Sequence, residues 1–76
     1  MKDKIQAIIN SLISKQVNDS IDLFEAKLLD SISLVDLALL LEKEFAISID
    51  TNELNDKNFS TVNQITTFIQ HEQEND

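Results

Sequence analysis

Glycine and proline are both absent from this 76-residue sequence. Tight β-hairpin turns depend heavily on glycine, and no stretch sustains the period-2 alternation of a half-buried strand. Apolar residues recur instead at helical spacing. The sequence therefore predicts an all-α protein that forms one domain over residues 1–76, a small four-helix bundle with three longer helices and one short helix.

The spacing of the apolar residues places these helices along the chain. A first helix is predicted over residues 3–16 and a second over residues 30–45. A short turn of helix fits residues 50–56, and the last helix is expected to begin near residues 60–61. The polar tail, residues 71–76, is expected to be disordered.

Helical periodicity breaks down between residues 16 and 29, where turn-forming residues alternate irregularly with apolar ones. This pattern predicts a long loop that its apolar side chains hold against the core. Loops of this length are unusual in compact domains and often carry function.

The second predicted helix carries apolar residues on two faces. One face has the spacing of a helix that packs on a core, and it holds Leu34, Leu37, Ala38, Leu41 and Phe45. The opposite face carries Ile32, Val35 and Leu39, interleaved with Asp36, Glu42 and Lys43. This second face predicts a surface for partner proteins, formed by Ile32, Val35, Asp36, Leu39 and Glu42. Alternatively, Ile32, Val35 and Leu39 could pack under the loop of residues 16–29.

The charge balance limits the partners of the chain. Fourteen acidic residues against six basic ones give a net charge of −8 at pH 7. Such a surface repels phosphate backbones, so nucleic acid is excluded as a partner, while basic protein surfaces are attracted to it.

Several chemistries and locations are disfavoured by the residues present. The chain has no cysteine, which excludes disulfides and thiolate metal sites, and no other metal site is expected. The only histidine, His71, lies in the tail, and no glycine-rich oxyanion turn exists, so the chain is not expected to be an enzyme. No apolar run is long enough to span a membrane, and residues 1–15 are amphipathic rather than a cleavable signal. A cytoplasmic monomer is the expectation.

A set of short motifs extends over nearly the whole chain. The central ones are Asp30-Ser31-Ile32, Val35-Asp36-Leu37 and Leu41-Glu42-x-Glu44-Phe45-x-Ile47, and the outer ones include Phe24, Leu28-Leu29 and Asn58-Phe59-Ser60-Thr61-Val62. Together they resemble the acyl carrier proteins and the related peptidyl and D-alanyl carriers.

This resemblance implies a function and a cofactor. In that family a transferase moves 4′-phosphopantetheine from coenzyme A onto the serine of an Asp-Ser motif, and the thiol of the arm then carries an acyl or aminoacyl group as a thioester. Carried onto this sequence, the attachment residue is Ser31 and Asp30 completes the motif. The implied partners are the transferase, a loading ligase or acyltransferase, and downstream enzymes with basic surfaces. An aminoacyl carrier of a specialised pathway and an unmodified helical interaction module remain as alternatives.

The chain departs from the family pattern beside the motif. Many carriers have glycine in the segment before the motif, where this chain has Lys27 and Leu28, so a stiffer and more crowded approach to Ser31 is expected. Ser33 stands where fatty-acid carriers usually have an acid, and Lys43 interrupts a run of acids. These differences favour the aminoacyl branch slightly and leave the cargo open.

Overall fold

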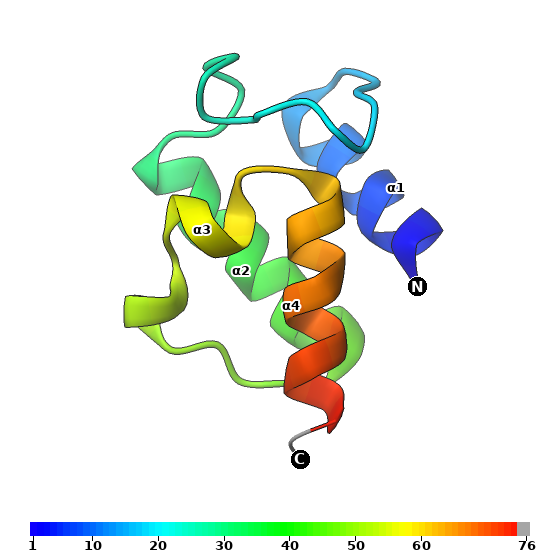
Figure 1. Cartoon of the computed structure of the whole chain (residues 1–76), viewed down its shortest axis with the longest axis vertical. Helices are drawn as coiled ribbons and strands as arrows, with labels where there is room; N and C mark the ends of the chain where they lie inside the picture. The colour runs from blue at the N-terminus through cyan, green and yellow to red at the C-terminus, as the bar shows by residue number, and fades with distance from the viewer. Residues whose placement is uncertain (75–76) are drawn as a thin grey trace.

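The computed structural model describes residues 1–74, and every regular element in them is helical (Figure 1). The elements are α1 (Lys2–Ile13), α2 (Ser31–Phe45), a short 3₁₀ turn η1 (Thr51–Glu53), α3 (Asp56–Phe59) and α4 (Val62–Glu74). The predicted small four-helix bundle, with three longer helices and one short one, is confirmed.

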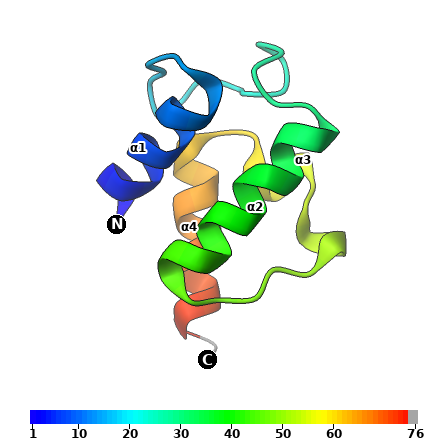
Figure 2. The same cartoon turned by 180° about the vertical axis from the view of Figure 1, so that it is seen from behind.

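The helices form a bundle measuring 32 × 24 × 18 Å (Figures 1 and 2). α1 packs against both α2 and α4, and α3 packs against α4. The segment between α1 and α2 arches over one end of the bundle, and the chain then enters α2 from that end (Figure 2).

The core is a single apolar cluster to which every longer helix contributes. α2 contributes Leu34, Leu37, Ala38 and Leu41, as its sequence pattern predicts, while Phe45 lies at the margin and is only partly buried. α4 contributes mainly Val62, Ile65, Phe68 and Ile69, and α1 contributes Ile5 and Ile9. The rings of Phe59 and Phe68 meet at a centroid distance of 5.2 Å and a tilt of 54°, an arrangement that aromatic pairs favour.

The loop between α1 and α2 is fixed to this core, as the sequence predicts. Leu23 is fully buried, and its backbone N–H donates to the carbonyl of Ser60 at 2.6 Å. The carbonyl of Leu23 in turn accepts from the N–H groups of Leu28 and Leu29 at 2.9 and 3.1 Å. Leu29 is also buried, so the residues that lead into α2 are held by apolar burial and hydrogen bonds together.

Two element boundaries differ from the sequence-based expectation. α1 ends at Ile13 rather than near residue 16, because Ser14 adopts a left-handed conformation (φ 58°) that turns the chain away. The short turn of helix expected over residues 50–56 forms as η1, and an additional short helix that was not expected, α3, follows it. Asp50 caps η1, and the side chain of Asn55 caps the separate helix α3 by accepting from the N–H of Asn58 at 3.1 Å.

α4 begins where the sequence predicts, but it ends later than expected. Thr61 caps the helix by accepting from the N–H of Gln64 at 3.1 Å. The helix then continues through Glu74, so the expectation of a disordered tail is wrong for residues 71–74. Residues 75–76, the rest of that expected tail, lie outside the described residues.

The start of α2 depends on Asp30. Its Oδ1 accepts from the backbone N–H of Ser33 at 2.8 Å, which satisfies one of the free N–H groups of the first turn. This hydrogen bond is the main cause that holds the pKa of Asp30 below its usual value. The charged form of Asp30 is therefore the form that stabilises the helix start.

A prediction follows for Lys27, which has a left-handed backbone (φ 58°) three residues before Asp30. That conformation costs a residue with a Cβ about 1 kcal/mol or more and costs glycine almost nothing. Glycine loses part of this gain, about 0.4–1 kcal/mol, through the entropy of the unfolded chain. We expect Lys27→Gly to leave the free energy of unfolding equal or slightly raised, and Lys27→Val to lower it by about 1–2 kcal/mol, as measured by chemical denaturation.

The matched control is Lys43→Gly, the same change at an exposed, right-handed position of α2. It should lower stability by about 1 kcal/mol. Equal losses at both positions would contradict the role given to the backbone of Lys27.

A second prediction concerns the pH dependence of stability. Because the pKa of Asp30 is lowered in the folded protein, its contribution is fully present above the pKa of the unfolded chain, about 4. It is lost as the pH falls through the folded value. Asp30→Asn keeps a good capping residue but no longer titrates. We expect the thermal midpoint of the parent to fall more steeply between pH 5 and 3 than that of Asp30→Asn. Parallel curves for the two proteins would show that Asp30 contributes nothing to acid sensitivity.

Candidate functional site

The candidate site lies at the start of α2, where Ser31 is the first helical residue and is exposed. Asp30, directly before it, is the capping residue, so the Ser31 hydroxyl is not needed to close the first turn. The first turn of a helix presents free N–H groups and the positive end of the helix dipole, which favours a negatively charged phosphodiester there. Position and charge at Ser31 both fit a phosphate-linked group.

The residues before Ser31 lie partly in the core. Leu28 packs partly against it and Leu29 is buried, while Ser31 is exposed. Lys27 is exposed and adopts the left-handed conformation that glycine accepts most easily. The chain thus makes at Lys27 the turn that glycine would favour, and the crowding expected at Leu28 stays a prediction.

The second apolar face of α2 is exposed, as one of the two sequence-based interpretations requires. The side chains of Ile32, Val35 and Leu39 are 74, 47 and 58% exposed. They do not pack under the loop, so that alternative is excluded. Asp36 lies among them and is exposed as well. The second face is thus available for contact with other proteins, as a partner surface requires.

Two residues of α2 differ from the sequence-based assignment. Leu40, which belongs to neither predicted face, is 42% exposed and extends the apolar strip toward α1. Glu42 is half-buried, and its Oε2 accepts from the backbone N–H of Ile49 at 2.7 Å. This carboxylate fixes the chain that leaves α2, so it is less available to a partner than Asp36. The wheel pattern places Leu40 at the edge of the strip, but Ile49 lies beyond the helix and could not be linked to Glu42 from spacing.

The described residues also bear on a metal site and on a membrane span. Within them, no cluster of three or more histidine or acidic side chains is arranged to hold a metal ion. Across residues 1–74, no helix has the length and hydropathy that crossing a membrane requires. His71 lies on the outer side of α4 and is not part of the α2 start.

Comparison with known proteins identifies the family. A family model described as a phosphopantetheine attachment site matches residues 3–69. The D-alanyl carrier proteins of Leuconostoc citreum and Leuconostoc mesenteroides are each 33% identical over 92% of this chain and 92% of their own length. The D-alanyl carrier protein of Streptococcus mutans is 34% identical over 91% of this chain and 90% of its own length. The chain therefore belongs to the family of phosphopantetheine-binding carrier proteins, which carry acyl or aminoacyl groups on a covalently attached 4′-phosphopantetheine.

Proposed function

We propose that Ser31 is the attachment residue, and that the chain carries a D-alanyl or similarly small aminoacyl group to partner enzymes. The exposed hydroxyl at the first position of α2 is the observation that carries the assignment of Ser31. The proposed cargo is inferred from the relatives, which are named D-alanyl carrier proteins and match along nearly the whole chain. A fatty-acyl cargo is the competing possibility within the same family.

The chemistry divides between this chain and its partners. During attachment the Ser31 oxygen forms a bond to the phosphorus of coenzyme A's pantetheine phosphate, the pyrophosphate bond breaks, and adenosine 3′,5′-bisphosphate leaves. The Ser31 proton passes to a base of the transferase. The arm supplies the thiol, which this cysteine-free chain lacks, and with it the capacity to hold a thioester. Asp30 holds the first turn in place, so Ser31 keeps its position throughout.

The exposed face of α2 is the proposed recognition surface. Ile32, Val35 and Leu39 offer apolar contact area beside Ser31, and Asp36 adds a negative charge. Any enzyme that acts on a group attached to Ser31 must cover this end of α2. Basic partner surfaces would be drawn to it by a chain with a net charge of −8. We further propose that the protein acts as a monomer in the cytoplasm, where coenzyme A is available.

We expect Ser31→Ala to abolish attachment without disturbing the fold. Because Asp30 is the cap, the change at Ser31 should alter the free energy of unfolding by no more than about 0.5 kcal/mol. The measurement is intact mass after incubation with coenzyme A and a broad-specificity transferase. The parent should gain one phosphopantetheine, and a further D-alanyl mass after addition of ATP, D-alanine and a D-alanine–carrier ligase.

The control is Ser33→Ala, one half-turn along the same helix, which should still be modified. A phosphopantetheine mass on Ser31→Ala would refute the assignment of Ser31. A parent that stays at its sequence mass beside an active transferase would identify an unmodified interaction module instead. A parent that accepts the arm but rejects D-alanine would refute the cargo alone.

We expect Asp36→Lys to slow attachment by about tenfold or more at low ionic strength, because it reverses a charge within the recognition surface. The effect should diminish as salt is raised, since exposed charges are screened. The measurement is the initial rate of modification at subsaturating carrier concentration, with helical content checked by circular dichroism.

Glu74→Lys is the matched control, because it changes the net charge equally at the last residue of α4, outside α2. Lysine is also favourable at a helix C-terminus, so the control should fold normally. Equal rates for the two variants would mean that only the overall charge matters, and the recognition surface would have to lie elsewhere.

A further inference from the structure

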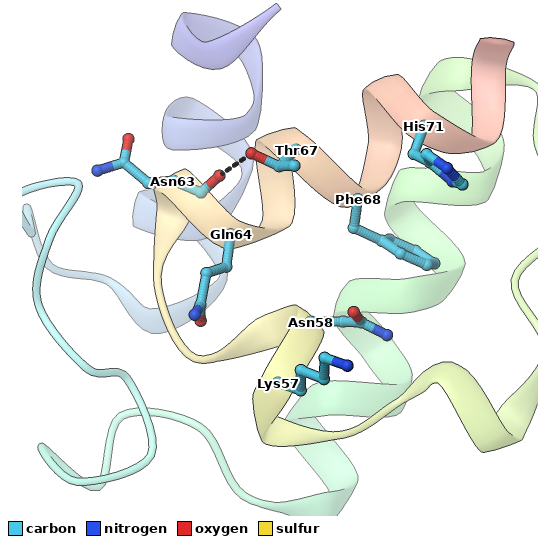
Figure 3. A pocket seen from close by; sticks show the side chains of 7 residues that line it. All are labelled: Lys57, Asn58, Asn63, Gln64, Thr67, Phe68 and His71. Atoms are coloured by element: carbon cyan, nitrogen blue, oxygen red, sulfur yellow. Dashed lines mark hydrogen bonds between the residues drawn. The ribbon is translucent and has the colours of Figure 1, made fainter.

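Two hollows of about 360 Å³ each lie on the surface, between different pairs of helices. One lies between α3 and α4, where Figure 3 shows Asn58 and Phe68 pointing toward one another. Polar side chains of this hollow already have partners within the chain. Asn58 donates to the carbonyl of Glu53 at 3.0 Å, and Gln64 accepts from the hydroxyl of Ser60. The other hollow lies between α1 and α2, the helix of the proposed recognition surface.

The α1–α2 hollow has a mostly apolar lining without net charge. Ala7 and Ser11 are small, exposed side chains one turn apart on α1, and Leu40 of α2 is 42% exposed beside them. Lys4 and Glu44, which also line the hollow, form an ion pair at 3.0 Å, so their charges balance. A hollow of this kind is suited to an apolar side chain from a partner protein.

Leu40 connects this hollow with the recognition surface. Residues three and four positions apart are neighbours on the surface of a helix, so Leu40 lies beside both Asp36 and Lys43. Leu39, which is 58% exposed, lies one turn before Lys43 on the same helix. Lys43 therefore lies between the exposed apolar residues of the recognition surface and the hollow.

Lys43 is an exposed cation whose acidic neighbours are both engaged elsewhere. Glu42 accepts from the backbone N–H of Ile49 at 2.7 Å, and Glu44 is paired with Lys4. Across the described part of the chain, Lys43 itself takes part in no ion pair. Its place in the last turn of α2 suits the helix dipole, and its charge remains available to a carboxylate from outside.

The outer face of α2 thus carries two charges of opposite sign. Asp36 and Lys43 are seven residues apart, which corresponds to about 10 Å along the helix axis. A partner surface that is basic throughout is attracted at Asp36 and repelled at Lys43. A partner with a basic side chain opposite Asp36 and an acidic one opposite Lys43 is attracted at both. Charge complementarity therefore calls for an acidic residue next to the α1–α2 hollow.

The distance from Ser31 indicates which partner makes this contact. Leu40 and Lys43 lie nine and twelve residues after Ser31, which is roughly 14 and 18 Å along the helix axis. An enzyme that attaches the arm must reach the Ser31 oxygen itself. An enzyme that acts on the thiol can lie up to an arm's length away, roughly 16 Å for an arm with about as many backbone atoms as five residues. The far half of α2 is therefore open to the enzyme that loads the thiol.

We propose that the loading enzyme inserts an apolar side chain into the α1–α2 hollow and pairs an adjacent acidic side chain with Lys43. This inference rests on the proposed attachment at Ser31 and on the proposed D-alanyl cargo, whose ligase is the loading enzyme. The ligase then contacts α1 as well as α2. Lys43 acts as a specificity-determining residue, because it favours a partner with an acid at this point over one that is basic throughout.

The test uses the complete protein with its arm attached, which intact mass verifies for each variant. The rate at which the D-alanine–carrier ligase transfers D-alanine to the thiol is measured at subsaturating carrier for the parent, Lys43→Glu and Ala7→Gln. The matched controls are Lys57→Glu and Thr67→Gln. They introduce the same side chains at exposed residues that line the α3–α4 hollow instead. Circular dichroism checks that every variant is folded.

We expect Lys43→Glu to be loaded about tenfold more slowly at low ionic strength, because it places a like charge opposite the acid of the ligase. Raised salt should reduce this difference. Ala7→Gln should also be loaded about tenfold more slowly, and at any salt concentration, because the new side chain fills the hollow that the apolar side chain needs. Both controls should be loaded at the rate of the parent.

The general charge of the molecule makes the opposite prediction for Lys43→Glu, since this change makes the net charge more negative and favours basic partners. Loading of Lys43→Glu at the parent rate or faster would therefore overturn the acidic contact. Parent-like loading of Ala7→Gln would overturn insertion into the hollow. Either result leaves attachment at Ser31 intact. A parent that takes the arm but accepts no D-alanine would refute the cargo and this contact together.

Discussion

The burial of Leu23 is the contact on which the geometry of the site depends. Its side chain lies in the core while its N–H and carbonyl form three backbone hydrogen bonds, one to Ser60 and two to the residues just before α2. A loop without regular structure is thereby tied to the junction of α3 and α4. Because Leu29 is buried beside it, the chain can enter α2 only at one place, with Asp30 and Ser31 outside the core. The position of the Ser31 hydroxyl is thus a consequence of apolar packing several residues away.

α2 presents one face to the core and another to solvent. Its inner face supplies four buried residues to the core, while its outer face exposes Ile32, Val35 and Leu39 to solvent. Exposed apolar side chains contribute nothing to the stability of the isolated protein, and they are the part of an interface that gives contact area when a partner covers them. The negative charge that surrounds them favours encounter with basic surfaces and keeps the free carrier soluble.

Much of this organisation can be predicted from the sequence, because it depends on periodicity and local capping. The two faces of α2 and the loop held by its apolar residues follow from residue type and spacing. The features that could not be predicted depend on contacts between distant residues. The hydrogen bond between Glu42 and Ile49 can be predicted only if the direction in which the chain leaves α2 is known. The hollow between α3 and α4 can be predicted only if the relative placement of the two helices is known. α3 is only four residues long, which is too short for a clear helical pattern in the sequence. The expectation of a disordered tail fails because a polar sequence also fits the exposed side of a helix, and residues 71–74 continue α4.

The two contacts that hold the far half of α2 have a mechanical consequence. Glu42 is bound to the connection beyond the helix and Glu44 is paired with Lys4 of α1, so this half is anchored on both flanks. The half that begins at Ser31 has its outer face free. A displacement of the first turn is therefore resisted by the anchored half through the backbone of α2, because the two halves belong to one continuous helix.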